Sequence, residues 1–353
     1  MQAGARRRPA LALALALAAS LLAAAPTTAR SAGIALEEAM VPADEPGIRL
    51  YLRNKHPEGV DRFGPDRTLL FVHGATYPAE TSFDLPLGGR SWMDAIAERG
   101  FDVYLVDLRG YGRSTRPEEM DQPPEANGPI VTTDVAIRDV GAAVDHILRK
   151  RGIDRLDLLG WSWGTAIMAG YAQANPQKVD RLVLYATLWE LQGASPLGTA
   201  QGKMGAYRTV TRQAAYDRWV RGVPQDKRAG LIPEGWFDAW ADATFATDPR
   251  GAAQDPPVLR APNGVRHDVE ERWQKGEPTW DPARITAPVL LVQAEWDQDT
   301  PPYMSQAVFP LLTHAPWKRY TLIGEGTHTI IMERNRQQLF DVVQTFLEEP
   351  APR

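Results

Sequence analysis

The sequence predicts an α/β protein built on a doubly wound, mostly parallel sheet that carries an inserted helical cap. Short continuous apolar runs of four or five residues recur along the chain, as expected of strands that are covered on both faces. Segments with the apolar spacing of amphipathic helices lie between these runs. One long stretch, residues 188–281, interrupts the alternation and contains no convincing run of this kind.

The alternation of strands and helices fixes the order of the predicted elements. Residues 48–56 alternate apolar and polar side chains, which is typical of an edge strand. The buried strands are predicted over residues 68–72, 103–106, 156–159, 182–185, 289–292 and 319–323, and helices over 137–148, 165–174 and 339–347. Strands that alternate with helices in this way imply a mostly parallel, doubly wound sheet.

The N-terminus has the pattern of a bacterial export signal. Arg6, Arg7 and Arg8 precede an apolar run from Ala10 to Ala25, which is shorter than the roughly 20 residues that a membrane span needs. Thr27-Thr28-Ala29 offers a small-residue cleavage site. We therefore expect residues 1–29 to be removed after Ala29 and the protein to be periplasmic or secreted, by the Sec or the twin-arginine route. An uncleaved membrane anchor is the alternative.

The composition excludes several classes of protein. The absence of Cys excludes a lipoprotein anchor, disulfides and Cys-ligated metals. The formal net charge is −5, and residues 1–29 contribute three Arg and no acid, so the processed chain is more acidic still. Such a chain lacks the basic surface that binds nucleic acid. No later segment is apolar enough to cross a membrane, so no stable membrane insertion is expected after processing. The oligomeric state stays open.

The segment Gly160-Trp161-Ser162-Trp163-Gly164 matches the pattern G-x-S-x-G. A predicted buried strand leads directly into it and a predicted helix follows, which is the context of a nucleophile elbow. The turn is so tight that side chains at both ends would collide, hence the two glycines. The motif therefore predicts Ser162 as a nucleophile, raised above the sheet at a helix N-terminus.

A serine nucleophile needs a base that removes its proton, and the chain contains six His. His328 lies in a Gly-containing loop, residues 324–328, just past the last predicted strand. Ligands of open parallel sheets bind beyond the carboxyl ends of the strands, where Ser162 also falls. His73 ends a strand beside Gly74, where we expect it to shape the backbone. These positions favour His328 as the base.

The base needs a carboxylate partner, and the transition state needs two oxyanion donors. Asp297 and Asp299 both follow the strand over 289–292. The distance from the strand end favours Asp297, while Asp299 stays open as an alternative that is otherwise expected to cap the next helix. The backbone N–H groups of Trp163, immediately after the nucleophile, and of Ala75, after His73-Gly74, are the predicted oxyanion donors.

Together these motifs resemble the α/β-hydrolase superfamily over about residues 48–348. The segments that carry the resemblance are HGA at 73–75, DLRGYGRS at 107–114, GWSWG at 160–164, EWDQD at 295–299 and GTH at 326–328. DLRGYGRS and GWSWG look most like the branch of proline iminopeptidases and small-ester hydrolases. The resemblance implies a core of residues 30–187 and 282–353, a helical cap over 188–281, and hydrolysis without cofactor or metal. Trp161 departs from it, because iminopeptidases usually carry Gly there.

A serine nucleophile suits attack on a carbonyl. We therefore predict an exported esterase that cleaves a small, hydrophobic carboxylic ester through an acyl-enzyme. An iminopeptidase-like aminopeptidase acting on amides, a lactone or C–C bond hydrolase, an acyltransferase and a non-enzymatic binding protein are the alternatives. The insertion holds six of the 11 Trp of the chain. Trp161, beside the nucleophile, and Trp189, just after the strand over 182–185, are predicted to line the substrate pocket.

Overall fold

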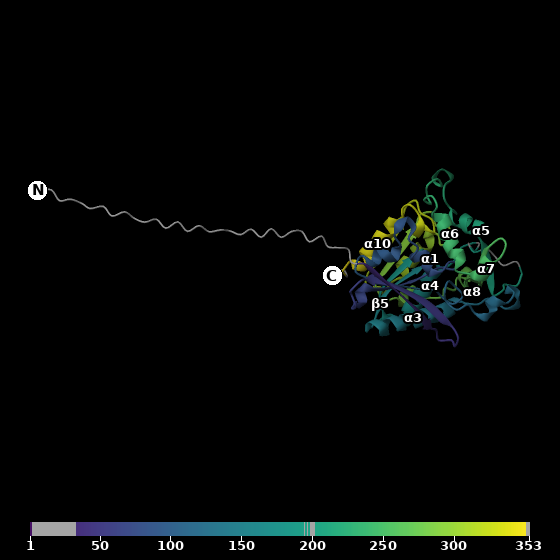
Figure 1. Ribbon diagram of the computed structural model, residues 1–353, viewed down its shortest axis with the longest axis horizontal. Coiled ribbons are helices and arrows are strands. Elements are labelled where there is room, and N and C mark those ends of the chain that lie inside the picture. The colour runs from purple at the N-terminus through teal and green to yellow at the C-terminus, as the bar shows by residue number, and fades with distance from the viewer. Residues whose placement is uncertain (2–32, 194, 196, 198–201, 351–353) are drawn as a thin grey trace. The chain divides into compact units, whose positions relative to one another are not determined.

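An eight-stranded sheet forms the centre of the fold (Figure 1). The computed structural model describes Met1 and residues 33–350, except 194, 196 and 198–201. The predicted signal segment, residues 1–29, lies outside these residues except for Met1. The strands of the sheet are β1 (Ile34–Pro42), β2 (Arg49–Pro57), β3 (Thr68–Val72), β4 (Asp102–Val106), β5 (Leu156–Trp161), β6 (Val179–Tyr185), β9 (Val289–Ala294) and β10 (Lys318–Ile323).

The strand order is β1-β2-β4-β3-β5-β6-β9-β10. β2 runs antiparallel to both of its neighbours, and every other pair in the sheet is parallel. This arrangement confirms the predicted mostly parallel α/β fold. One detail is wrong: the segment predicted as the edge strand is β2, and β1 lies outside it. The sequence pattern does not mark β1 as a strand, because Glu37 and Glu38 interrupt its apolar residues.

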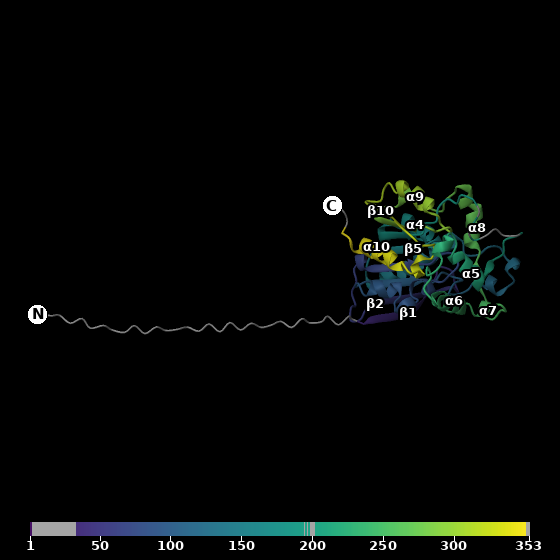
Figure 2. The ribbon, with the colours of Figure 1, turned by 90° about the horizontal axis from the view of Figure 1, so that it is seen from above.

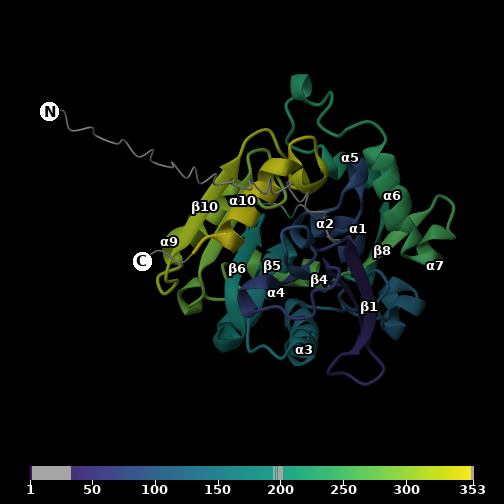
Figure 3. The same ribbon diagram turned by 60° about the vertical axis from the view of Figure 1, so that its left-hand side comes forward.

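Helices cover both faces of the sheet, as a doubly wound fold requires. They are α1 (Ala79–Phe83), α2 (Trp92–Ala97), α3 (Thr133–Arg151), α4 (Trp163–Ala174), α9 (Pro302–Leu311) and α10 (Arg336–Glu348). One face packs against α3, α4 and α9, and the opposite face packs against α1, α2 and α10. α3 and α10 accordingly lie on opposite sides of the strands in Figure 3.

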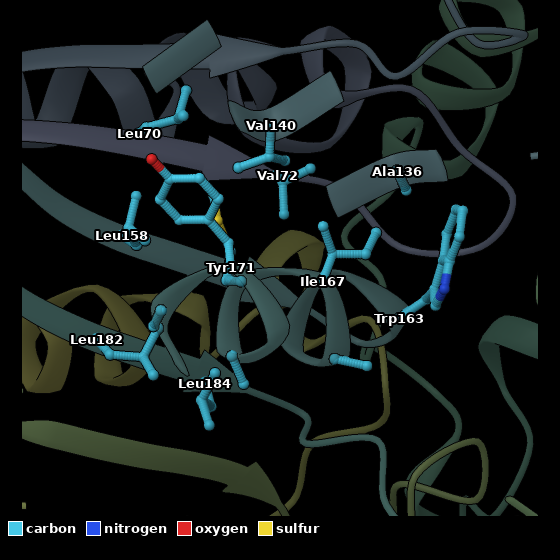
Figure 4. Close-up of a cluster of buried hydrophobic side chains, with 14 of the residues drawn as sticks. Leu70, Val72, Ala136, Val140, Leu158, Trp163, Ile167, Tyr171, Leu182 and Leu184 are labelled. Atoms are coloured by element: carbon cyan, nitrogen blue, oxygen red, sulfur yellow. The ribbon is translucent and has the colours of Figure 1, made fainter. Parts of the chain in front are cut away.

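The core beneath α3 and α4 is made of aliphatic side chains from the middle of the sheet. Figure 4 shows Val140 of α3 and Ile167 of α4 pointing toward Val72 of β3 and its neighbours. All three side chains are fully buried. Each contributes about 1.5–3 kcal/mol of transfer free energy. This packing fixes the position of α4, and hence of the turn that precedes it.

Residues between β6 and β9 form a separate layer at one end of the strands. Its elements are β7 (Tyr207–Thr211), α5 (Arg212–Trp219), α6 (Trp236–Ala246), α7 (Pro249–Ala252), β8 (Val258–Pro262) and α8 (Gly264–Glu271). The four helices lie together at the same end in Figures 1 and 2. The expected helical character is present, but β7 and β8 also pair as an antiparallel two-stranded sheet that the sequence pattern did not predict. Their pairing joins short segments that lie far apart in the sequence.

Candidate active site

Ser162 occupies a sharp turn between β5 and α4. Its backbone has φ 60° and ψ −122°, which a residue with a side chain adopts only under constraint from its surroundings. A Cβ at Gly160 would lie 2.2 Å from the carbonyl oxygen of Gly164, and a Cβ at Gly164 would lie 2.7 Å from that of Val72. Glycine is therefore required on both sides, and the turn presents Ser162 at the N-terminus of α4.

His328 lies on the loop after β10 and is held by two kinds of contact. Its Nδ1 lies 2.8 Å from Oδ2 of Asp297. Its backbone carbonyl accepts hydrogen bonds from the Trp161 indole N–H, at 3.1 Å, and from the Tyr185 hydroxyl, at 2.8 Å. Ser162 and His328 line the same cavity, although their side chains share no hydrogen bond within the described part of the chain. Such bonds are often long before substrate binds.

Asp297 is the carboxylate that contacts Nδ1 of His328. It is fully buried, and both of its oxygens are satisfied. Oδ1 accepts from the backbone N–H groups of Asp299, at 2.8 Å, and Thr300, at 2.9 Å. Oδ2 accepts from Nε2 of Gln293, at 2.9 Å, and from the Thr300 hydroxyl, at 3.0 Å. These donors fix the orientation of the carboxylate toward the imidazole.

Asp299 has a different role in the site. Its Oδ2 lies 3.9 Å from Nε2 of His328, on the opposite side of the ring from Asp297. It also forms ion pairs with Arg218, at 2.5 Å, and with Arg221, at 3.2 Å. Burial acts to raise the pKa of Asp299, but the charges of Arg218 and Arg221 and the hydrogen bond from Arg218 oppose it, and this pKa lies below its usual value.

The two predicted oxyanion donors belong to peptides whose carbonyl groups are held in place. The carbonyl of Ser162 accepts from the N–H of Thr165, at 2.9 Å, and from its hydroxyl, at 2.5 Å. Because a trans peptide directs its N–H opposite to its C=O, the N–H of Trp163 points away from these contacts. As the first residue of α4, Trp163 has no acceptor within the helix.

His73 holds the other peptide in the same manner. Its Nε2 accepts the backbone N–H of Leu108, at 3.1 Å, so the ring proton lies on Nδ1 and is donated to the carbonyl of Gly74, at 2.7 Å. The N–H of Ala75 is thereby directed away from that contact. Burial lowers the pKa of His73 to about 4, which keeps the ring neutral. His73 therefore shapes the backbone, as its position at the strand end suggested.

Ser162 lies where two cavities meet. The first, the aromatic cavity, is walled by Tyr77, Trp161, Trp219 and Trp240. The apolar walls of the second, the aliphatic cavity, include Leu188, Leu191, Val265 and Val269. Both cavities also share Ala75 and Arg218. The site therefore offers apolar space on both sides of the nucleophile.

Two predicted pocket residues have different positions in the structure. Trp161 lines the aromatic cavity, with its ring 5.5 Å from that of His328. Trp189 lines neither cavity at Ser162, so the prediction for it is wrong. It lines a third cavity, where it stacks edge-on against Trp280 at 5.1 Å. Leu188, one residue earlier, faces the aliphatic cavity.

Besides these aliphatic residues, Arg218, Trp219 and Trp240 of the inserted layer line the site, and none of the three belongs to a sequence motif. Trp219 and Trp240 form much of the aromatic wall, and their rings stack edge-on at 5.1 Å. Arg218 lines both cavities. The high Trp content of the insertion indicates that some of its Trp side chains line the pocket, but it does not identify Trp219 and Trp240 as the ones near Ser162. Nothing in the sequence distinguishes Arg218 from the other arginines of the insertion.

The described residues contain no group of three or more His, Asp or Glu side chains arranged to hold a metal ion. Within the same residues, no helix has both the length and the apolar character needed to cross a membrane.

Known proteins resemble the chain in sequence. Residues 67–335 match the model of the alpha/beta hydrolase fold family. A probable proline iminopeptidase from Streptomyces coelicolor is 25% identical over 270 residues, which cover 74% of this chain and 68% of that protein. A proline iminopeptidase from Xylella fastidiosa is 29% identical over 136 residues, which make up 37% of either chain.

Solved structures share the fold over most of the chain. CarC, a serine hydrolase involved in carbazole degradation, superposes with a TM-score of 0.60 at 17% identity, covering 89% of this chain and 99% of CarC. The 2-hydroxy-6-oxo-6-phenylhexa-2,4-dienoate hydrolase from Rhodococcus sp. strain RHA1 gives a TM-score of 0.58 at 16% identity, with the same coverage. At these identities the similarity extends to the fold alone.

Proposed function

Because the chain belongs to the alpha/beta hydrolase fold family, we propose that it is a serine esterase that cleaves a small, apolar carboxylic ester. The observation that carries the proposal is the position of Ser162 at the junction of two apolar cavities, with the hydrogen-bonded pair His328 and Asp297 beside it. An ester whose carbonyl carries an apolar group on each side matches this shape.

The proposed mechanism assigns one step to each residue. Nε2 of His328 takes the proton of Ser162 as its Oγ attacks the ester carbonyl. Asp297 holds the Nδ1 proton of His328 and stabilises the imidazolium that forms. The N–H groups of Ala75 and Trp163 bind the oxyanion. His328 then protonates the departing alcohol, and later deprotonates the water that hydrolyses the acyl-enzyme and restores the Ser162 hydroxyl.

The charges at the site favour an ester over the substrate of an aminopeptidase. An aminopeptidase must bind the α-ammonium group of its substrate, and a buried ammonium needs an anionic or hydrogen-bonding partner. Among the described residues that line the two cavities, the only acid is Asp299. Its carboxylate is already paired with Arg218 and Arg221. Proline iminopeptidase activity, suggested by the relatives, is therefore the second candidate.

We further propose that residues 188–281 act as the cap that sets substrate size. The support for this role is that Trp219 and Trp240, both within this range, line the aromatic cavity together with Trp161 of the sheet. The aliphatic cavity is likewise lined by residues of this range, namely Leu188, Leu191, Val265 and Val269. When an inserted layer supplies the pocket walls, substitutions in that layer change the pocket without disturbing the sheet beneath it.

A side-by-side substrate comparison tests the proposal. Initial rates are measured with p-nitrophenyl butyrate and with proline p-nitroanilide, and Ser162→Ala serves as the background control. We expect kcat/KM for the ester to exceed that for the anilide by at least about 100-fold, because an unpaired buried ammonium costs several kcal/mol. A preference for the anilide would replace the esterase assignment with the aminopeptidase.

A further inference from the structure

A second carboxylate lies beside His328, the proposed base, near Nε2, the ring nitrogen that takes the proton of Ser162 in the proposed mechanism. Oδ2 of Asp299 is 3.9 Å from Nε2 of His328, whereas Asp297 contacts Nδ1. The Asp299 side chain is only 3% exposed, so solvent screens its charge weakly. An unneutralised carboxylate at this position stabilises the protonated imidazole. General-base catalysis, however, requires an unprotonated Nε2.

Arg218 neutralises this carboxylate at the oxygen nearest the imidazole. Its Nε donates to Oδ2 of Asp299 at 2.5 Å. The Arg218 side chain is 15% exposed, and its Nη1 donates to the hydroxyl of Thr76, at 2.9 Å, in the loop that carries Ala75. Arg221 reaches the other oxygen, Oδ1, at 3.2 Å, and is 41% exposed. Arg218 is therefore the more buried of the two partners and the one closer to the base.

We infer that Arg218, through its ion pair with Asp299, is a positioning residue of the cap that neutralises the carboxylate beside Nε2 of His328, the atom that acts as the base. The inference rests on the proposed serine-hydrolase function. It gives the cap a role in the chemistry besides the shape of the cavities. When α5 is in place, Arg218 forms its ion pair with Asp299. If α5 moved away, Asp299 would lose this ion pair and its carboxylate would remain beside Nε2 of His328.

The charged and titratable groups around His328 come from several elements. They are Asp297 and Asp299 after β9, Arg218 of α5, Arg221 just after that helix, Tyr185 of β6, and Glu333 after the His328 loop. Tyr185 contacts only the backbone carbonyl of His328. Glu333 contacts Thr327 and Trp219 rather than the ring. Asp299 and its arginine partners are therefore the groups that act at Nε2.

This arrangement predicts opposite effects for the two halves of the ion pair. Arg218→Met leaves the Asp299 charge facing the ring, which stabilises the imidazolium and moves the acidic limb of the pH profile to higher pH. Asp299→Asn removes the negative charge and leaves Arg218, which moves the same limb to lower pH. The double variant removes both charges and returns the limb close to its original position. Each single shift is expected to be about one pH unit.

The experiment measures the rate at which a fluorophosphonate probe labels Ser162 between pH 5 and pH 9, in the full chain and in the three variants. Arg212→Met is the matched control, because Arg212 lies on the same helix but pairs with Asp238 and Asp242 at the surface. We expect its profile to overlay that of the wild type. Labelling is read by mass spectrometry of the Ser162 peptide, which reports the base without requiring the natural substrate.

The outcomes separate the inference from the function on which it rests. If the wild type is not labelled at Ser162 at any pH, the serine-hydrolase proposal fails. If labelling occurs but the acidic limb is the same in the wild type, Arg218→Met and Asp299→Asn, the function stands and the role of Arg218 is refuted. Should Arg218→Met show no cooperative thermal transition, Asp299→Asn decides alone: a shift to lower pH supports the inference, and no shift overturns it.

Discussion

Trp219 of α5 donates its indole N–H to Oε1 of Glu333 at a distance of 3.1 Å. The same carboxylate accepts the hydroxyl of Thr327 and, through Oε2, the backbone N–H of Thr327 at 3.1 Å. Thr327 precedes His328, so a single buried carboxylate links the cap to the loop of the proposed base. Burial raises the pKa of Glu333 to about 7.

The raised pKa of Glu333 predicts a pH-dependent stability. In the folded protein the Glu333 carboxyl group keeps its proton up to about pH 7, whereas in the unfolded chain it loses this proton near the ordinary Glu pKa of 4.5. The contribution of the protonated group is therefore complete below about pH 4.5 and is lost as pH rises to about 7. Relative to Glu333→Gln, the wild-type free energy of unfolding should be greater at pH 5 than at pH 8. Urea titrations at both values check this, and a difference independent of pH would contradict it.

Asp297→Asn should be far more damaging than Asp299→Asn. Because one oxygen of Asp297 accepts two backbone N–H groups, an amide at 297 would turn its NH2 group toward Nδ1 of His328 and favour the wrong tautomer. Such a change lowers kcat by about 10⁴-fold in a Ser-His-Asp triad. Asp299→Asn leaves the Nδ1 contact intact, so at its own pH optimum it should retain at least about a tenth of the activity. The two kcat values at matched folding decide the question. The reverse ranking would make Asp299 the acid.

The cavity walls predict which tryptophan controls substrate size. Trp240 lies against Trp219 in the aromatic cavity, whereas Trp189 lies against Trp280 in another. Trp240→Phe enlarges the aromatic cavity, so the kcat/KM ratio of benzoate to acetate p-nitrophenyl esters should rise about threefold or more. Trp189→Phe is the matched control and should leave this ratio unchanged, since a ratio is insensitive to the folded fraction. A change only in Trp189→Phe would refute the assignment of the walls.

We propose that the mature protein is exported and begins near Arg30. The prediction rests on the basic residues Arg6 to Arg8, the short apolar run and the cleavage site ending at Ala29. Mass spectrometry of protein recovered from the periplasm or the medium should find an N-terminus within a few residues of Arg30. Recovery of intact chain beginning at Met1 from the cytoplasm would contradict export.

The sheet and the proposed triad are predictable from the sequence because local patterns encode them. Continuous apolar runs mark strands covered on both faces, and the two glycines around Ser162 follow from the steric limits of one turn. The choice of Asp297 followed from its spacing after the strand, and it is this carboxylate that contacts Nδ1 of His328. Each of these features depends on residues that are close together in the sequence.

The features that escaped prediction depend on contacts between distant segments. The ion pair of Arg218 with Asp299 joins residues 81 positions apart, and no sequence motif contains both of them. The pairing of β7 with β8 similarly joins two short segments with an intervening helical stretch. The prediction for Trp189 fails because two neighbouring residues face different cavities. Leu188 lines the aliphatic cavity at Ser162, whereas Trp189 lines another cavity.

The central claim is that Ser162 is the nucleophile of an esterase, and Ser162→Ala tests it most directly. The substitution removes one oxygen from a buried side chain, so circular dichroism and the melting temperature should match those of the wild type. With p-nitrophenyl butyrate as substrate, we predict a loss of kcat/KM of about 10⁴-fold or more, because the members of such a triad act as a unit. Retention of more than about a tenth of the wild-type value, in a variant free of wild-type protein, would contradict the account.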